Sequence, residues 1–353
     1  MFPDRVVRAT RIRGFHIAIP SSTIPVVGAC VAVSSAFLLS HHKVILRMFP
    51  EPNPRKAMAG TASAARTMSV AVAAFLLASC GGGGGGTEPT TPNVTSVSAG
   101  TPKYSQTLLF TVVGTNLDKG LVVSAPGCTG MALSTAAPNV SSPTVGYYVC
   151  KVSAVGPSQA SVATTSGATL ATAPYTVPLP MVTMNISNGA GVAGALVLAL
   201  DPAKTPITVD NFLGYVNSGF YVGTIFHRVV AGFVVQGGGF LPIVSGAAPV
   251  AKATNAPITL EVGRGLSNVQ WSVAMARTPV ANSATSQFFI NLVDNSAFLD
   301  PSSVNAGYAV FGSVTAGTAV AAAIVGAPCA AIPNFSECAP NPNVVITSAV
   351  QTQ

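Results

Sequence analysis

The sequence predicts a mainly β chain in which two β domains follow an N-terminal leader. Residues 94–178 contain short Val- and Thr-rich segments separated by Gly and Pro, the spacing of an all-β sandwich. Residues 181–200 alternate apolar and polar side chains, as a half-buried hairpin does. Hydrophobic residues make up 49% of the 353 residues and charged residues only 8%, so there is enough apolar surface for two cores.

The basic charge of the chain is confined to the leader. The formal net charge is +7, and residues 1–79 hold nine Lys and Arg against two Asp and Glu. In residues 80–353, eight basic side chains balance eight acidic ones. The folded part therefore lacks the concentrated positive charge by which proteins bind nucleic acid, and we expect no nucleic-acid partner.

Residues 66–80 have the organisation of a secretory signal. Arg66 precedes an apolar run from Ser69 to Ala78, which is shorter than the about 20 residues that span a bilayer. The run closes on Leu77-Ala78-Ser79-Cys80, which resembles the bacterial lipobox, a motif whose Cys is diacylated and becomes the first mature residue. We therefore expect lipidation of Cys80 and a periplasmic or surface lipoprotein of the bacterial cell envelope, held to a membrane by the lipid.

Residues 1–57 permit two interpretations. They carry a second apolar stretch, from Ile24 to Leu39, behind four arginines, which would suit a membrane anchor. Alternatively, translation starts at Met58 or Met68, and residues 1–57 are an upstream extension absent from the protein. We favour the second interpretation, because a lipoprotein signal so far from the start of the chain would be hard to use.

Residues 80–93 form a tether in front of the first domain. Six glycines are followed by a Thr- and Pro-rich spacer, a composition that gives a flexible chain with a typical reach of roughly 20 Å. In the domain of residues 94–178, the segment from Phe110 to Leu117 resembles a strand of bacterial immunoglobulin-like modules of the IPT/TIG kind. This domain has no histidine and only Asp118 as an acidic residue, so we expect a spacer or a protein-binding module.

The four cysteines after Cys80 fall into two local pairs. Export would place them in an oxidising compartment. We therefore predict disulfides Cys128–Cys150 and Cys329–Cys338, with four buried thiols as the alternative. Neither pair has the spacing of a zinc site, and His227 is the only histidine after the leader, so we expect no metal.

The second domain begins with a predicted hairpin and helix. Strands from Met181 to Ile186 and from Ala195 to Leu200 flank a turn at Asn188-Gly189. In Thr205-Pro206, Thr is a typical helix N-cap and Pro a typical first helical residue. We expect this helix to run to Val216.

Four sequence blocks then follow in order. They are Phe226 to Gly238, which contains Phe-His-Arg and Gln-Gly-Gly; Ser272 to Arg277; Ser283 to Ile290; and Phe298 to Asp300 with Gly307 to Gly312. In order and spacing they resemble cyclophilin-type peptidyl-prolyl cis–trans isomerases of the bacterial periplasmic kind, over about residues 182–350. The resemblance implies that residues 181–353 form a closed eight-stranded antiparallel β-barrel capped by two helices, the second from Ala316 to Val325.

The resemblance also implies the residues of an active site. The catalytic ones are Arg228, Phe233 and Gln236, and those that contact substrate are Val234, Ala276, Arg277, Gln287, Phe289, Phe298, Leu299 and Tyr308. Three positions depart from the usual family pattern: Ala231 replaces a Pro, Val234 replaces a Met, and Phe298 stands where eukaryotic members carry a Trp. None of them removes the core of the site.

The chemistry of these residue types favours the same function. Rotation about a peptide bond has a barrier of about 18–20 kcal/mol, because the C–N bond has partial double-bond character. Lowering that barrier requires no nucleophile, metal or cofactor; it requires a fixed cation that favours the twisted amide. Arg228 is always charged and presents a rigid set of donors. Phe233, Val234, Phe289 and Leu299 offer an apolar slot for the proline ring.

We therefore expect a peptidyl-prolyl cis–trans isomerase (EC 5.2.1.8) that acts as a monomer on proline-containing polypeptides and assists the folding of exported proteins. Two alternatives remain: a catalytically weak cyclophilin that serves as a binding module or chaperone, and a structural lipoprotein whose β domains only bind partners. We expect His227 to be structural. The segment Gly237 to Gly239 lacks the Lys-Ser/Thr of a phosphate-binding loop.

The lipobox leads to a direct test. We predict that the mature chain begins at a lipid-modified Cys80, and mass spectrometry of the membrane fraction should find a diacylglyceryl group on this residue. A mature protein whose N-terminus lies elsewhere and carries no lipid would contradict the prediction.

Overall fold

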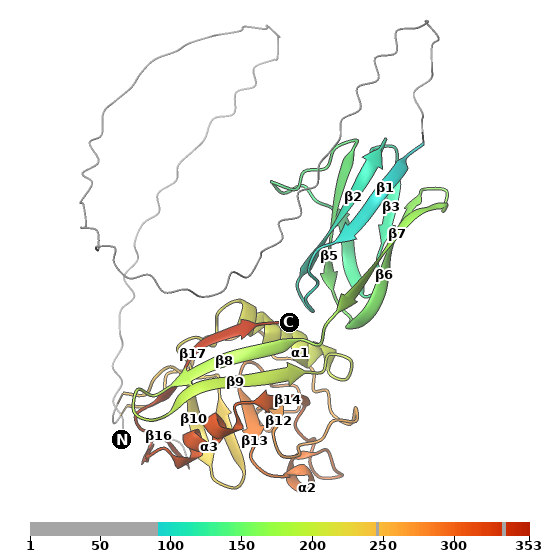
Figure 1. The fold of residues 1–353 in the computed structure, drawn as a ribbon. Helices are drawn as coiled ribbons and strands as arrows, with labels where there is room; N and C mark the ends of the chain where they lie inside the picture. The colour runs from blue at the N-terminus through green and yellow to red at the C-terminus, as the bar shows by residue number, and fades with distance from the viewer. Residues whose placement is uncertain (1–90, 245–246, 334–336) are drawn as a thin grey trace, which may run out of the picture. The chain divides into compact units, whose positions relative to one another are not determined.

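The computed structural model describes residues 91–244, 247–333 and 337–353 (Figure 1). These residues belong to the unit Gly81–Gln353. The leader, Cys80 and most of the tether lie outside the described residues, so the predictions on residues 1–90 stay predictions.

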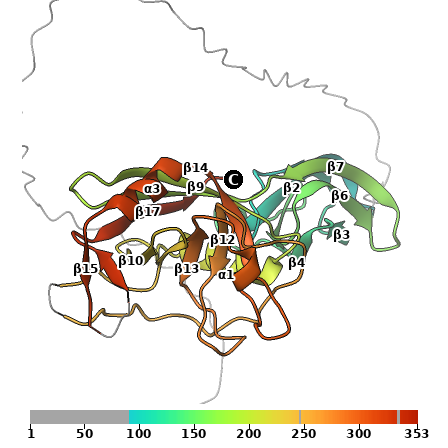
Figure 2. The ribbon, with the colours of Figure 1, turned by 90° about the horizontal axis from the view of Figure 1, so that it is seen from below.

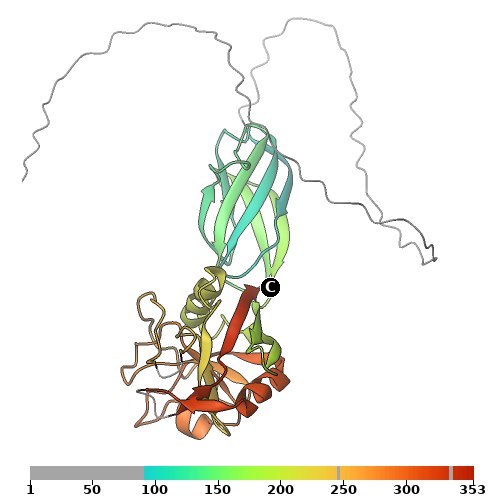
Figure 3. The same cartoon turned by 90° about the vertical axis from the view of Figure 1, so that its left-hand side faces the viewer.

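Residues 93–177 form two antiparallel sheets with the strand orders β1-β2-β5-β4 and β3-β6-β7 (Figure 3). The strands are β1 (Asn93–Ala99), β2 (Thr107–Thr115), β3 (Leu121–Ser124), β4 (Cys128–Leu133), β5 (Val145–Val152), β6 (Gly156–Thr164) and β7 (Thr169–Val177). Short Val- and Thr-rich segments of the kind seen in the sequence form β2, β3, β5 and β6. The mainly β prediction is thus confirmed, while the immunoglobulin-like assignment stays a prediction.

Alternation of side chains builds the core between these two sheets. In β2, Leu108, Phe110 and Val112 are almost completely buried, whereas the residues between them are more exposed. Phe110 of one sheet meets Tyr175 of the other edge to face, with ring centroids 5.6 Å apart. The sheets are therefore held together by large apolar side chains at every second position.

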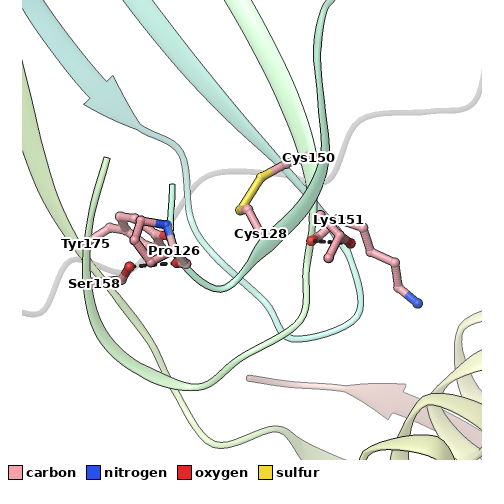
Figure 4. Close-up of a disulfide and its surroundings, with 7 residues drawn as sticks. Pro126, Cys128, Cys150, Lys151, Ser158 and Tyr175 are labelled. Atoms are coloured by element: carbon pink, nitrogen blue, oxygen red, sulfur yellow. Dashed lines mark hydrogen bonds between the residues drawn. A yellow bond between two sulfur atoms is a disulfide. The ribbon is translucent and has the colours of Figure 1, made fainter. Parts of the chain in front are cut away.

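A disulfide and a carbonyl group that accepts two hydrogen bonds secure one end of these sheets (Figure 4). The disulfide Cys128–Cys150 joins the neighbouring strands β4 and β5, with a Cα–Cα distance of 5.6 Å. Close by, the carbonyl of Pro126 accepts hydrogen bonds from the hydroxyls of Ser158 and Tyr175, each at 2.7 Å. The predicted pairing of Cys128 with Cys150 is confirmed.

The second domain is a closed antiparallel barrel in the order β10-β11-β13-β12-β14-β9-β8-β17 (Figures 1 and 2). Its strands are β8 (Met181–Ser187), β9 (Ala193–Leu200), β10 (Ile225–Val230), β11 (Val234–Gly237), β12 (Ser272–Met275), β13 (Phe288–Asn291), β14 (Val310–Ala316) and β17 (Val344–Gln351). The eight-stranded barrel is therefore as expected. The turn between β8 and β9 is closed by Asn188, whose Oδ1 accepts from the backbone N–H groups of Ala190 and Val192.

Helices α1 (Pro206–Asn217) and α3 (Thr318–Gly326) pack against the barrel strands, as the resemblance implied. Helix α3 begins two residues later than predicted, because Ala316 still belongs to β14 and Gly317 adopts a left-handed conformation (φ 89°) that ends the strand. A third, short helix, α2 (Ser296–Leu299), was not predicted. Among the described residues, no helix has the length and apolar character needed to cross a bilayer.

The N-terminus of α1 differs from the prediction in one detail. Thr205 does occupy the N-cap position, but its hydroxyl donates to the carbonyl of Asp201 rather than accepting from the helix. Instead, the buried carboxylate of Glu261 accepts from both the backbone N–H (2.8 Å) and the hydroxyl (2.9 Å) of Thr208. A negative charge at this end also suits the helix dipole. A residue distant in sequence therefore caps α1.

A small hairpin adjoins β10. Strands β15 (Cys329–Ala331) and β16 (Cys338–Pro340) pair with each other, and the predicted disulfide Cys329–Cys338 links them. Strand β16 contacts β10.

The unusual cap can be tested by stability. Glu261→Ala should lower the free energy of unfolding of the barrel by about 2–3 kcal/mol, because two buried donors of Thr208 lose their acceptor. Urea unfolding followed by the fluorescence of Trp271, the sole tryptophan, reports on this domain. Thr205→Val is the matched control and should cost less, since its hydroxyl makes only a 3.3 Å bond. A larger loss for Thr205→Val would show that the cap is misassigned.

Candidate active site

The wall of the barrel carries apolar side chains on both faces. Along β11 and β13, Val235 and Phe288 belong to the barrel core, whereas their neighbours Val234 and Phe289 belong to a separate cluster. This follows from the two-residue period of a strand. The second group, here the outer cluster, consists of Val234, Ala274, Phe289, Leu299 and Val310, with Phe233, Leu266, Ala276 and Tyr308 packed against it.

A β-bulge in β10 directs Arg228 to the same outer face. Phe226 pairs with Gly237 and Arg228 pairs with Gln236, and the register shifts between these pairs, so His227 is an extra residue. In a regular strand, Phe226 and Arg228 would face the same side of the sheet, because they are two residues apart. The bulge places them on opposite sides, so Phe226 lies in the barrel core and Arg228 stands beside the outer cluster.

The outer cluster forms the floor of a cavity of about 160 Å³. The cavity is lined by Arg228, Phe233, Val234, Gln236, Ala276, Arg277, Phe289, Leu299 and Tyr308. The rings of Phe289 and Tyr308 meet edge to face, with centroids 5.6 Å apart. Since small-molecule sites usually have about 300 Å³ or more, this cavity suits a single side-chain ring.

The structure thus brings together nine of the eleven predicted site residues, and the other two lie outside this lining. Gln287 lines a neighbouring cavity of about 170 Å³, where its Oε1 accepts from Gln236 Nε2 at 2.9 Å. Gly239 leaves room for this glutamine, because a Cβ there would collide with its side chain. Phe298 is 73% exposed on α2 and does not line either cavity.

The two arginines of the cavity differ in how their donors are used. Arg277 donates Nε to the carbonyl of Gly307 (2.8 Å) and Nη1 to that of Thr278 (2.9 Å), and its guanidinium lies 4.6 Å from the ring centroid of Tyr308. Among the residues that the structure describes, Arg228 makes a single ion pair, from Nη2 to Glu337 at 2.7 Å. Arg277 therefore braces the cavity wall, whereas Arg228 keeps donors for a ligand.

A chain of buried amides supports the cavity from beneath. Asn295 donates to the carbonyl of Phe233 (2.9 Å) and to Asn291 Oδ1 (2.8 Å), and Asn291 donates to Asn268 Oδ1 (3.1 Å). Asn268 in turn donates to the carbonyls of Leu299 and Tyr308, each at 3.2 Å. Three residues of the cavity lining are thus fixed through their backbones by one continuous hydrogen-bond network.

An acidic residue completes this network at its solvent side. Asp300 Oδ1 accepts from both the backbone N–H and the side-chain amide of Asn268, each at 2.8 Å, and Ser267 donates its hydroxyl to Oδ2. Charged acceptors make stronger hydrogen bonds than neutral ones. Asp300 therefore anchors the C-terminal end of α2, which carries Leu299.

Comparison with known proteins identifies the barrel. The family model for "Cyclophilin type peptidyl-prolyl cis-trans isomerase/CLD" matches residues 181–351. Peptidyl-prolyl cis-trans isomerase cyp18 of Streptomyces antibioticus is 53% identical over 137 residues, which are 38% of this chain and 79% of that protein. Peptidyl-prolyl cis-trans isomerase B of Escherichia coli is 47% identical over 135 residues, again 38% of this chain and 79% of the relative. The chain belongs to the cyclophilin-type peptidyl-prolyl isomerases.

A further relative, peptidyl-prolyl cis-trans isomerase A of Dickeya dadantii, is 55% identical over 129 residues, which cover 36% of this chain and 65% of that protein. The family model matches the domain formed by β8 to β17, here the cyclophilin domain. The sheets formed by β1 to β7 precede the residues that the family model matches.

Two features of the cyclophilin site were missed by the sequence analysis. Glu337 is the single acidic residue between the two cysteines of the hairpin, and this position could have suggested it as a partner for a basic side chain. The amide network could have been suspected from Asn268, Asn291 and Asn295, because asparagines at buried positions need partners.

His227, the extra residue of the bulge, is 1% exposed and lies against Phe240, with ring centroids 4.6 Å apart. Its burial lowers the pKa of the imidazole to about 4, and the charge of Arg228 acts in the same direction. His227 is therefore neutral at physiological pH, in keeping with the structural role expected for it.

This burial makes the cyclophilin domain sensitive to acid. Between about pH 6.5 and pH 4 the unfolded chain binds a proton at His227 that the folded domain does not bind, so the free energy of unfolding falls as the pH falls through this window. The full effect is on the order of 3 kcal/mol at 1.36 kcal/mol per pH unit. We expect His227→Gln, measured by urea unfolding at several pH values, to flatten this part of the profile. An unchanged profile would contradict the prediction.

Proposed function

We propose that this chain accelerates X–Pro isomerisation in exported polypeptides and that Arg228 is the group that stabilises the twisted prolyl amide. One observation carries the proposal: Arg228 stands at a ring-sized cavity with an apolar floor and has donors still available among the described residues, whereas Arg277 donates to backbone carbonyls.

Arg228 has the properties that the reaction demands. As the amide twists, it loses conjugation and the prolyl nitrogen becomes a better hydrogen-bond acceptor. A guanidinium that donates to this nitrogen binds the twisted amide more tightly than the planar one, and only such differential binding accelerates a reaction. A thousandfold acceleration requires about 4 kcal/mol, at 1.36 kcal/mol per tenfold. One charge-assisted hydrogen bond together with restraint of the ring is of this size.

The remaining residues of the cavity bind the substrate in this proposal. The apolar floor formed by Phe233, Val234, Phe289 and Leu299 takes the proline ring. Gln236, held by Gln287, binds the adjoining backbone, and Ala276 with Arg277 and Tyr308 borders the neighbouring residue. Phe298, exposed on α2, is available to residues of the substrate outside the cavity.

The proposed setting is the bacterial cell envelope. The signal-like residues 66–80 with Cys80, the glycine tether and two disulfides all suit an exported protein that folds in an oxidising compartment. There the isomerase would act as a lipid-anchored monomer on proline-containing polypeptides. The alternative is a domain that binds such segments with little catalysis.

Substitution of Arg228 tests the mechanism. Arg228→Ala should lower kcat/KM for an X–Pro peptide by on the order of a hundredfold, because the group selective for the twisted amide is lost. Arg228→Lys should restore little, since an ammonium cannot reproduce the planar donor set. Phe233→Ala should mainly raise KM, because it removes part of the ring-binding floor. A protease-coupled assay measures all of them.

Arg264→Ala serves as the control, because Arg264 is an exposed arginine of the same domain outside both cavities. It should keep wild-type activity. Arg228→Ala with wild-type kcat/KM and an unchanged circular dichroism spectrum would refute the role of Arg228. A wild-type protein that binds X–Pro peptides without accelerating their isomerisation would favour the binding-module alternative.

A further inference from the structure

We infer that Glu337 is a positioning residue for Arg228: the disulfide-linked hairpin that carries it holds the guanidinium over the cavity in the orientation used for catalysis. This inference rests on the proposed function of Arg228. It assigns a role in the reaction to a hairpin whose described residues do not line the cavity.

The contact itself is short and directed. Glu337 Oε1 lies 2.7 Å from Arg228 Nη2, within the range of a strong charge-assisted hydrogen bond. The bond engages one terminal nitrogen, and among the described residues the guanidinium makes no other hydrogen bond. The donors on Nε and Nη1 are therefore left for the prolyl amide, while the pair fixes the plane in which they lie.

This ion pair is more protected from solvent than the other two in the described part of the chain. The side chains of Arg228 and Glu337 are 25% and 32% exposed. Those of Lys119 and Asp118 are 51% and 45% exposed, and those of Lys151 and Asp210 are 50% and 38% exposed. Fully exposed pairs contribute little because water and salt screen them, so Arg228–Glu337 is the pair best able to hold its geometry.

The hairpin is anchored on the C-terminal side of Glu337. Glu337 directly precedes Cys338, whose disulfide to Cys329 closes the hairpin. At the base of the hairpin, the backbone N–H of Asn341 donates to the carbonyl of Pro328 at 2.8 Å. The carboxylate therefore projects from an anchored segment, as a positioning residue must.

Charge balance in the cavity favours the same role. Arg228 and Arg277 both line a cavity of about 160 Å³, so two like charges share a small space. Arg277 is held in place by carbonyl groups and by the ring of Tyr308. Glu337 gives Arg228 the corresponding restraint and offsets the repulsion from Arg277, which would otherwise favour rotamers that turn Arg228 toward solvent.

The kinetic test removes the carboxylate from Glu337. Glu337→Ala should lower kcat by roughly fivefold to tenfold and leave KM within about twofold, because the cavity floor that binds the ring is unchanged while the orientation of Arg228 is lost. Glu337→Gln keeps an acceptor without the charge and should fall between Ala and wild type. Asp118→Ala, which breaks the exposed pair with Lys119, is the matched control and should change neither constant.

The hairpin is tested by its disulfide. Cys329→Ser with Cys338→Ser should lower kcat as much as Glu337→Ala does, and adding Glu337→Ala to this variant should lower it no further, since both changes remove the same restraint. Cys128→Ser with Cys150→Ser removes the other disulfide and should leave kcat unchanged. Strictly additive losses would overturn the link between hairpin and arginine.

A spectroscopic readout separates this inference from the proposed function. In nitrogen-15 spectra of labelled arginine side chains, Arg228 should show hindered rotation of its guanidinium in the wild type and free rotation in Glu337→Ala, with Arg228→Lys identifying the signal. Unchanged rotation, or a kcat that is equal or higher in Glu337→Ala, overturns the positioning role. If the wild-type protein shows no isomerase activity, the proposed function fails, and the rotation alone then decides whether Glu337 orients Arg228.

Discussion

The site depends on one constraint, the alternation of side chains across a single layer of strands. Val235 and Phe288 fill the inside of the barrel, and Val234 and Phe289, one residue away, build the floor of the cavity outside it. The same wall is therefore packed on both faces. The bulge at His227 adds the one exception that the site needs, because it moves Arg228 to the outer face while Phe226 stays in the core.

Hydrogen bonds between polar groups, rather than apolar packing, hold the segments that border the cavity. Alternation along a strand does not hold the segments before β11 and after β13. The amide network of Asn268, Asn291 and Asn295 fixes them through the backbone carbonyls of Phe233, Leu299 and Tyr308. Each of these amides is buried, so an unsatisfied one would be costly, and the network has to form as a whole. Arg277 adds a further restraint, because its Nε donates a hydrogen bond to the carbonyl of Gly307.

The sequence allowed the barrel, its first hairpin and most of the cavity to be predicted, because ordered motifs and alternating apolar residues mark them. Strand β4 escaped prediction because it is largely exposed and lacks a regular apolar pattern. Local pattern also could not reveal that Glu261, and not Thr205, accepts from the N-terminus of α1, since the two segments are brought together only by folding. For the same reason the pairing of Arg228 with Glu337, which are 109 residues apart, had no signal in either segment.

The position of the cavity on the outside of the barrel determines what kind of molecule can reach it. A ligand inside a barrel must enter through an open end, which limits its size and requires a free terminus or a compact shape. A depression on the outer wall imposes neither condition, because a polypeptide can lie across it with both of its ends far away. Under the proposed function, a proline in the middle of a long or partly folded chain would therefore reach this cavity as readily as one in a short peptide.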